Sequence, residues 1–226
     1  MAAPAQDMAC VSACTIHSPL FCGSRHKNGI NLPFQDNLGI NITIYSLLMQ
    51  RIYEAMPAAV RSIWLMPSND DETLLASLVR DLADRFGTPV FQPHLTLRGD
   101  TTTETAALTE AIAAAARQVP VFAEPISSVD ITEAYFRAFY ARFAVSPTLA
   151  TLKRSLDPAE AGSFLPHISL LYGTLPAEQT APAAAAMGRR LAGRRITFDR
   201  ISVVRSGQDI PISEWSILAT APLTGS

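Results

Sequence analysis

The sequence predicts an α+β fold in which two pseudo-symmetric β-sheet lobes with outer helices face each other across a central groove. First, segments with strand periodicity alternate irregularly with segments of helical periodicity. Second, one short pattern, Pro-His-apolar-Ser/Thr-apolar, occurs at 93–97 and again at 166–170. Third, each copy follows a helix and a loop and precedes a turn, a helix and further strands. This arrangement is typical of an internal duplication, with one histidine in each lobe.

Composition and charge limit the kind of protein. The 226 residues are 48% hydrophobic and 17% charged, which is typical of a globular chain. A formal net charge of -2 argues against a broad basic surface for duplex nucleic acid, whereas a small phosphate ligand stays possible. No apolar run reaches the roughly 18 residues of a membrane span, and residues 1–20 lack the features of a secretory signal. We therefore expect a soluble, cytoplasmic monomer without a membrane partner.

Residues 1–58 differ in character from the rest of the chain. They have little charge and no sustained period, so we expect a poorly structured N-terminal extension before a domain at 59–226. The three cysteines of the chain all lie here: Cys10, Cys14 and Cys22. The domain therefore holds no disulfide, which suits a reducing compartment. With His26 the cysteines could form a zinc site, but their spacing fits no finger pattern and we predict no metal. Met56 is a candidate for the natural start of the chain.

The first predicted strand of the domain is the apolar run 62–66, which a proline closes. An acidic turn at 70–72 and apolar residues at helical spacing then predict a helix that ends at Gly87. The segment 91–98 is predicted to be a strand and carries the first histidine motif. After a Thr-rich turn, the Ala-rich segment 104–118 is predicted to be a helix.

The second half of the domain shows the same signals. Apolar and aromatic runs predict strands, while proline in a first turn and Ala-rich stretches predict helices. In order, the elements are strands at 121–131 and 134–145, a helix at 147–156, a strand at 164–172, a helix at 176–191, and strands at 196–204 and 215–219. We interpret the aromatic residues of 134–145 as core rather than as a ligand platform.

The two motifs place polar groups on one face of each strand. Because side chains alternate along a strand, each histidine shares a face with a hydroxyl, while the apolar residues between them point to the core. These pairs are His94 with Thr96 and His167 with Ser169. Two imidazoles with ordinary pKa values of about 6.5 can hold one proton between them, so that one accepts a proton while the other donates one. With the hydroxyls as donors to phosphate oxygens, the pattern favours displacement at phosphorus without a metal.

Arg98 extends the same alternation two residues beyond Thr96. On that argument its guanidinium shares the face of His94 and adds a cation for the phosphate. The competing interpretation is a solvated residue at the end of the strand. A single histidine on a strand is more often a core or rim residue than a catalyst, and the repetition of the motif is what favours catalysis.

In these residues the chain resembles the two-histidine (2H) phosphoesterase superfamily, whose mark is a paired His-x-Ser/Thr-x motif. Within that superfamily it is similar to the cyclic phosphodiesterase branch known from plants and yeast. The likeness covers roughly residues 61 to 222 in order. Besides the motifs it rests on the run Ser62-Ile63-Trp64-Leu65-Met66-Pro67, the aromatic stretch from Tyr135 to Pro147, the run His167-Ile168-Ser169-Leu170-Leu171-Tyr172, and Glu214-Trp215.

The resemblance implies a bilobal LigT-like fold, no cofactor, and hydrolysis of cyclic phosphates. In that branch the substrates are ADP-ribose 1'',2''-cyclic phosphate, a by-product of tRNA splicing, and nucleoside 2',3'-cyclic phosphates, which are opened to the 2'-phosphate. Carried over by motif, His94 and His167 are the acid and base, with His167 favoured as the base. Thr96 and Ser169 then bind the phosphate.

Two further residues enter through the resemblance. Tyr172 is expected to line the pocket and pack against the base or ribose, and Trp64 is expected to lie near it. Strict alternation aims Tyr172 away from His167, so that role requires a bend in the strand, and a core position is an equal alternative.

Other functions stay open at this point. An RNA 2',5'-ligase or RNA-end cyclic phosphodiesterase of the same superfamily would act on a polymer, which calls for several basic residues beside the motifs. A non-catalytic module could hold a nucleotide in the groove, although a pure binder has no need of both histidines and both hydroxyls. A structural domain predicts no pocket between the motif strands. We expect a small cyclic phosphate as the partner and no stable nucleic-acid complex.

Overall fold

The computed structural model describes residues 46–47, 51 and 59–225. Close contacts group Pro57–Ser226 into one unit, separate from the chain before it, and the fold below is that of this unit. Most of segment 1–58 lies outside the described residues, and so do the predictions that fall on it. These predictions are the zinc ligands Cys10, Cys14, Cys22 and His26 and the start at Met56.

Strands and helices alternate irregularly in the described domain, which confirms the predicted α+β class. The strands are β1 (Arg61–Pro67), β2 (Leu95–Thr101), β3 (Phe122–Ile131), β4 (Phe139–Phe143), β5 (His167–Leu171), β6 (Arg195–Arg205) and β7 (Ser216–Pro222). The helices are α2 (Asn69–Phe86), α3 (Thr105–Ala116), α4 (Pro147–Leu156) and α5 (Ala177–Leu191), with short 3-10 turns η1 (Tyr135–Arg137) and η2 (Ile212–Glu214).

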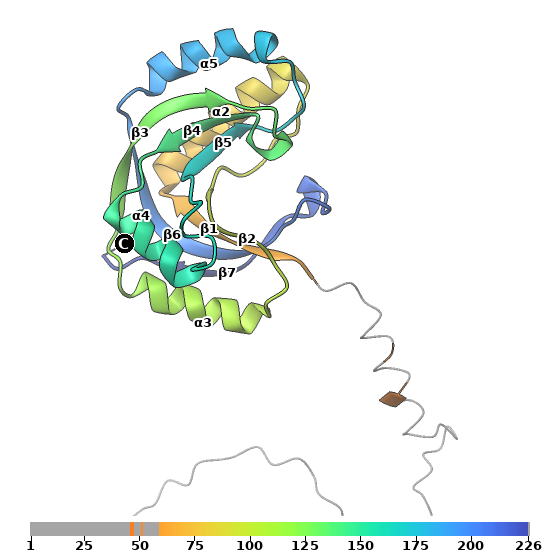
Figure 1. Cartoon of the computed structure of the whole chain (residues 1–226), viewed down its shortest axis with the longest axis vertical. Coiled ribbons are helices and arrows are strands. Elements are labelled where there is room, and N and C mark those ends of the chain that lie inside the picture. Colours follow the sequence, from red (N-terminus) through yellow and green to blue (C-terminus); the bar gives the residue numbers. More distant parts are fainter. Residues whose placement is uncertain (1–45, 48–50, 52–58, 226) are drawn as a thin grey trace, which may run out of the picture. The chain divides into compact units, whose positions relative to one another are not determined.

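The seven strands form one antiparallel sheet in the order β1-β2-β5-β4-β3-β6-β7. Because β1 also pairs with β6, six strands close into a ring and β7 lies outside it, on β6. The sheet consists of two lobes, β1, β2, β6 and β7 in one and β3, β4 and β5 in the other (Figure 1). The lobes are joined by the single pair Leu95 and Ile168 between β2 and β5, and by the segment 122–125 of β3 on β6.

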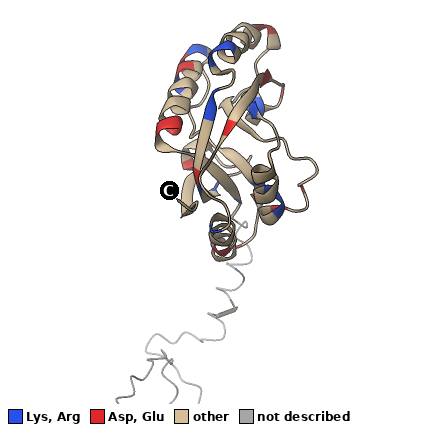
Figure 2. Ribbon diagram, turned by 90° about the vertical axis from the view of Figure 1, so that its left-hand side faces the viewer, with Lys and Arg blue, Asp and Glu red and all other residues tan. Residues whose placement is uncertain are grey.

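The helices cover the outer faces of the two lobes (Figure 1). α5 packs against β3 and α2 against β5, while α3 packs against β6 and β7 and α4 against β2. Basic and acidic residues are interspersed on the side that Figure 2 shows. Among the described residues, no helix combines the length and the apolar character that crossing a membrane requires.

Local sequence accounts for the limits of α2. Asp70, Asp71 and Glu72 place negative charge in the first turn, where the helix dipole favours it. Gly87 ends the helix with a φ of 65°, and its N–H donates to the carbonyl of Ala83. Residues with a side chain rarely adopt this left-handed conformation, so the glycine stops the helix where the sequence predicts.

Three predicted strands are shorter in the structure. The segment 134–145 is the turn η1 followed by β4, because the backbone of the turn is bonded to residues in and after β5. The motif strands begin at Leu95 and His167 rather than at 91 and 164. Pro93 and Pro166 precede these starts, and a proline has no N–H to donate to a sheet.

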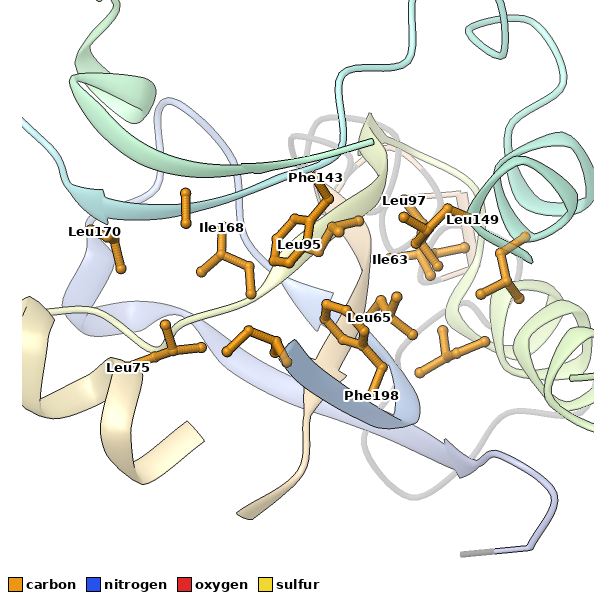
Figure 3. Packing of buried hydrophobic residues seen from close by; sticks show 14 of the residues in the cluster. Ile63, Leu65, Leu75, Leu95, Leu97, Phe143, Leu149, Ile168, Leu170 and Phe198 are labelled. Atoms are coloured by element: carbon orange, nitrogen blue, oxygen red, sulfur yellow. The ribbon is translucent and has the colours of Figure 1, made fainter. Parts of the chain in front are cut away.

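The main buried cluster combines apolar residues of the strands with residues of all four helices, and Figure 3 shows part of it. The apolar residues that alternate with the polar motif residues belong to it: Leu95, Leu97, Ile168 and Leu170, all 0% exposed. They pack with residues of β1, β4, β6 and α4 such as Ile63, Leu65, Phe143, Phe198 and Leu149. Burying one such side chain contributes about 1.5–3 kcal/mol to the stability of the fold. The apolar faces of the motif strands therefore hold these strands firmly in the core.

A β-bulge interrupts β2 at the last residue of its motif. Thr96 lies opposite Trp64 of β1. The next pair joins Arg98 to Ile63, so Leu97 is an extra residue on the β2 side. An extra residue shifts the alternation of side chains by one position beyond the bulge.

The second motif strand carries a bulge at the equivalent position. Ser169 of β5 lies opposite Tyr140 of β4, and the next pair joins Leu171 to Phe139. Leu170 is therefore the extra residue, three positions after the motif histidine, as Leu97 is in β2. The shared irregularity is what an internal duplication predicts.

Candidate active site

The pairing of β2 with β5 brings the two motifs together. In the observed antiparallel register, Thr96 lies beside His167 and His94 beside Ser169. Side chains opposite each other in this way have Cβ atoms about 4.5–5.5 Å apart. All four side chains line one cavity of about 460 Å³, with walls from both lobes.

Five aromatic residues contribute to the rest of the cavity wall, together with polar and small residues. Besides the motif residues it includes Ser62, Trp64, Asp100, Tyr135, Phe136, Arg137, Tyr172, Gln208 and Trp215. Phe136 and Trp215 are stacked on each other, with ring centres 6.0 Å apart. Tyr135 is 42% exposed, so one end of this aromatic wall reaches solvent.

His94 is buried against the indole of Trp64. The two ring centres are 3.5 Å apart and the planes differ by 6°. The Nδ1 atom lies 2.7 Å from the carbonyl oxygen of Gln92. Burial lowers the pKa of His94 to about 3, although the bond to Gln92 acts in the opposite direction. His94 is therefore neutral over the physiological pH range.

His167 has the same local geometry in a different environment. Its Nδ1 lies 2.8 Å from the carbonyl oxygen of Leu165. Its ring is nearly perpendicular to that of Tyr140, with centres 5.2 Å apart and planes that differ by 71°. Burial lowers the pKa of His167, the bond to Leu165 raises it, and the positive charge of Arg137 lowers it further.

The two backbone contacts set the tautomer of each ring. A carbonyl oxygen can only accept a hydrogen bond, so Nδ1 of His94 and of His167 must carry the proton. The other nitrogen, Nε2, is then left for the cavity in both residues. In a neutral ring Nε2 accepts a proton, and in a protonated ring it donates one. The pair can therefore act as acid and base on one ligand.

The two motif hydroxyls are not equivalent. Among residues 59–225, Thr96 Oγ1 has no hydrogen-bond partner, so it can donate to a ligand in the cavity. Ser169 Oγ instead donates to the carbonyl oxygen of Phe136, at 2.8 Å. Of these two hydroxyls, that of Thr96 is therefore the one free to donate to a ligand.

Tyr172 lies in the cavity wall because of the bulge at Leu170. Strict alternation would place it on the face opposite Ser169, and the extra residue brings it back to the same face. Its ring stacks on Phe91 with centres 3.6 Å apart. Burial raises the pKa of its phenol, and a hydrogen bond with Ser169 acts in the opposite direction. The side chain is thus both packed and part of the site.

Comparison with protein families decides the relationship. The model of the family described as the 2'-5' RNA ligase superfamily matches residues 60–210, which include both motifs and most of the sheet. The chain belongs to the 2'-5' RNA ligase superfamily. This is the two-histidine phosphoesterase group that the sequence resembles, so the predicted relationship is confirmed.

Individual proteins of known name are similar to this superfamily member at low identity. A protein of Arabidopsis thaliana named cyclic phosphodiesterase is 20% identical over 178 residues, which cover 75% of this chain and 98% of that protein. The crystal structure of E. coli LigT complexed with 3'-AMP has 15% identity and a TM-score of 0.48, and covers 74% of this chain and 99% of LigT. The protein TT0787 of Thermus thermophilus has 17% identity and a TM-score of 0.46, covering 73% and 97%.

One predicted site residue of this superfamily member lies elsewhere. Arg98 does not line the cavity, and its guanidinium bonds to the hydroxyls of Thr101 (3.2 Å) and Thr103 (3.4 Å). Strict alternation predicted that it shares the face of His94. The bulge at Leu97 reverses that alternation, which accounts for the position of Arg98 outside the described wall, as the bulge at Leu170 accounts for Tyr172 within it.

Sequence reasoning also missed Arg137, Phe136 and Trp215 as cavity residues. Arg137 and Phe136 belong to η1, which was predicted to be part of a core strand. A charged residue inside an aromatic run was the available signal, because a core strand has no place for an unpaired cation. Within the described residues, no cluster of three or more His, Cys, Asp or Glu side chains could hold a metal ion.

Proposed function

We propose that this protein is a metal-independent cyclic phosphodiesterase. Its substrates are ADP-ribose 1'',2''-cyclic phosphate, nucleoside 2',3'-cyclic phosphates, or both, opened to the phosphomonoester. The observation that carries this proposal is the pair of imidazoles in one cavity, each with Nδ1 directed at a backbone carbonyl. Membership of the superfamily and the similarity to a plant cyclic phosphodiesterase support the same class of reaction.

In the proposed reaction, Nε2 of the base histidine takes a proton from water, and the water oxygen forms a bond to phosphorus. The bond from phosphorus to one ring oxygen breaks on the opposite side. That oxygen takes the proton that Nε2 of the acid histidine donates. The product carries one new hydroxyl and a phosphomonoester, and the histidines have exchanged their protonation states. Thr96 donates to a non-bridging oxygen throughout.

The environments of the histidines favour His94 as the base and His167 as the acid. The base must be neutral and the acid protonated before the reaction begins. The pKa of His94 is lowered to about 3, so this ring is uncharged near neutral pH and its Nε2 can accept a proton. The pKa of His167 is also lowered, but this ring is less completely buried and is the easier of the two to protonate. This order is the reverse of the one that the sequence favoured.

The shape of the cavity supports a small ligand. A volume of about 460 Å³ lies within the roughly 300–1,000 Å³ of small-molecule sites. The exposed ring of Tyr135 and the stacked pair Phe136 and Trp215 offer flat surfaces on which a nucleobase can stack.

A polymeric RNA substrate is the second candidate, because the superfamily takes its name from an RNA ligase activity. Binding successive phosphates of a strand requires several cations along a groove. Apart from the histidines, Arg137 is the only basic residue in the described cavity wall. We therefore favour a small-molecule substrate and no stable complex with nucleic acid.

The proposal is tested by incubating the purified protein with three kinds of substrate. These are ADP-ribose 1'',2''-cyclic phosphate, the four nucleoside 2',3'-cyclic phosphates and an oligonucleotide that ends in a cyclic phosphate. We expect ring opening of one or both of the first two, with identification of the phosphomonoester product. Exclusive turnover of the oligonucleotide would favour the RNA candidate, and turnover of none would overturn the proposal.

Two variants tie the activity to the site. His94→Ala and His167→Ala should each lower turnover by about 10²–10⁴-fold, while Arg154→Ala on the exposed face of α4 should not. EDTA should leave the activity unchanged. Near-normal turnover in either histidine variant, or loss of activity in EDTA with recovery on adding zinc, would contradict the mechanism.

A further inference from the structure

Arg137 is an unpaired cation in the cavity wall. Its guanidinium carbon lies 5.7 Å from the centre of the Tyr140 ring. Its Nε is buried and has no hydrogen-bond partner, and none of the ion pairs among the described residues involves it. A buried donor on a charged group is costly unless an acceptor meets it. The side chain is therefore held ready for an anionic ligand.

No carboxylate of the described cavity wall forms an ion pair with Arg137. Asp100 is the only carboxylate in the described wall, and it accepts a hydrogen bond from the backbone N–H of Gln208 at 3.3 Å. The charge of Arg137 acts on His167, since it contributes to lowering the pKa of that ring after burial. The positive charge thus lies on the His167 side of the cavity.

Ser169 holds the turn from which Arg137 extends. The hydroxyl of Ser169 donates to the carbonyl of Phe136, the residue directly before Arg137. This hydroxyl proton is therefore directed at the backbone of η1 and away from a ligand. At the equivalent place in the first motif, Thr96 keeps its donor free. The first motif thus presents the hydroxyl of Thr96 to the cavity. The second motif holds the turn that presents the guanidinium of Arg137.

We propose that Arg137 binds the phosphoryl group of the ligand and that Ser169 positions Arg137. This inference rests on the proposed function, in which the ligand is the monoanion of a cyclic phosphodiester. The planar guanidinium presents parallel N–H donors, which match the two non-bridging oxygens of that group. Thr96 binds the same group from the other motif strand.

The same contact links binding to proton transfer. In the free protein the charge of Arg137 opposes a proton on His167. A phosphate anion bound to the guanidinium offsets that charge and favours the imidazolium. His167 therefore gains its proton when the substrate arrives, as a general acid must.

The competing explanation is that Arg137 only packs on Tyr140 and stabilises η1. The two explanations differ in ligand binding, which is measurable without catalysis. Inorganic phosphate is the probe, and its dissociation constant is determined by calorimetry for the wild type, Arg137→Gln and Arg137→Lys. The matched control is Arg142→Gln, which removes the same charge from β4 at a half-exposed side chain 3.9 Å from Asp130.

We expect Arg137→Gln to weaken phosphate binding by about 10- to 100-fold and to raise KM for a cyclic phosphate by a similar factor. Arg137→Lys should recover part of the affinity, because it keeps the charge but loses the paired donors. Arg142→Gln should change neither value more than about twofold. Wild-type affinity in a folded Arg137→Gln variant would overturn the inference.

A titration of His167 by NMR gives an independent measurement if turnover is too low to follow. Arg137→Gln should raise the pKa of His167, because the nearby positive charge is gone. An unchanged titration would show that the guanidinium is not beside the ring.

The proposed function and this inference can fail independently. If the wild type opens no cyclic phosphate but binds phosphate through Arg137, the proposed function fails and this inference stands. If the wild type opens cyclic phosphates and Arg137→Gln binds phosphate with wild-type affinity, this inference fails and the proposed function stands.

The positioning role of Ser169 is tested by a double-mutant cycle. Ser169→Ala should weaken phosphate binding in the wild type and have much less effect in Arg137→Gln, because both changes remove the same contact. Its KM should rise more than its kcat falls. Additive effects of the two substitutions on phosphate binding would show that Ser169 does not act through Arg137.

Discussion

At the scale of single residues, His94 and His167 have one backbone geometry and two environments. Both rings direct Nδ1 to the carbonyl two residues earlier. His94 is stacked on Trp64, whereas His167 has an edge contact with Tyr140 and a guanidinium nearby. Two equivalent motifs therefore give rings of unequal basicity, and the difference comes from their neighbours.

The assignment of acid and base predicts a dependence on the leaving group. A phosphodiester with 4-nitrophenolate as the leaving group needs no protonation of that oxygen, so it tolerates loss of the general acid. His167→Ala should lose much less activity on this ester than on a cyclic phosphate, and His94→Ala should lose about 10²–10⁴-fold on both. The measurement is kcat/KM of the wild type and of each variant on both substrates. The opposite pattern would make His94 the acid.

The pKa shifts predict an acidic optimum. The active form needs a neutral His94, which exists above a pKa of about 3, and a protonated His167, which exists below a pKa lowered from 6.5. Hence kcat/KM should be highest between these limits and should fall about tenfold per pH unit on the alkaline side. Steady-state kinetics from pH 4 to 9 tests this. A profile that is flat from pH 5 to 8 would contradict it.

At the scale of elements, helix α4 stabilises the bulge that shapes the first motif strand. Lys153 of α4 is buried, and its Nζ donates to the carbonyl of Leu97 at 2.9 Å and to Asp157 at 2.7 Å. The bulge takes Leu97 out of the regular pairing between β1 and β2. Lys153 of α4 thus donates to the carbonyl of Leu97 the hydrogen bond that a regularly paired residue of β2 would receive from the neighbouring strand.

Replacing Lys153 should therefore destabilise the domain. Lys153→Met leaves the carbonyl of Leu97 and the carboxylate of Asp157 without their partner, so the free energy of unfolding should fall by about 3–5 kcal/mol. Chemical denaturation measures this value. Adding Asp157→Asn should recover part of the loss. Arg154→Met, the exposed neighbour, should stay within about 0.5 kcal/mol, and an equally small effect of Lys153→Met would refute the role.

At the scale of the whole molecule, the site lies where the two lobes meet. Each motif strand ends the part of the ring that its own lobe contributes, and the two strands share one residue pair. The main buried cluster extends from Ile63 to Leu223, so both lobes share one core. The distance between the two histidines therefore depends on the whole ring being formed.

We predict that the fragment 59–226 folds and works on its own. All the core and cavity residues described above lie within it. The fragment should keep the kcat of the full chain within about twofold and should unfold in one cooperative transition. Activity assays and thermal unfolding followed by circular dichroism test this. Loss of cooperative unfolding in the fragment would show that residues 1–58 are part of the folding unit.

Much of the architecture was predictable from the sequence because its signals are local. Helix α4 spans the predicted residues, and α2 ends at its glycine, since capping and periodicity depend on neighbours along the chain. The position of each histidine beside a hydroxyl on one face follows from strand geometry. Because the motif occurs twice, the sequence also predicted that both faces line one ligand site.

The remaining features were decided only by the tertiary structure. Bulges at Leu97 and Leu170 move Arg98 out of the cavity wall and bring Tyr172 into it, and they are defined by pairing with β1 and β4. The turn that presents Arg137 is held by a serine more than thirty residues later. Alternation along a strand is a property of adjacent residues, whereas a change of register and the burial of a ring depend on partners that are distant in the chain.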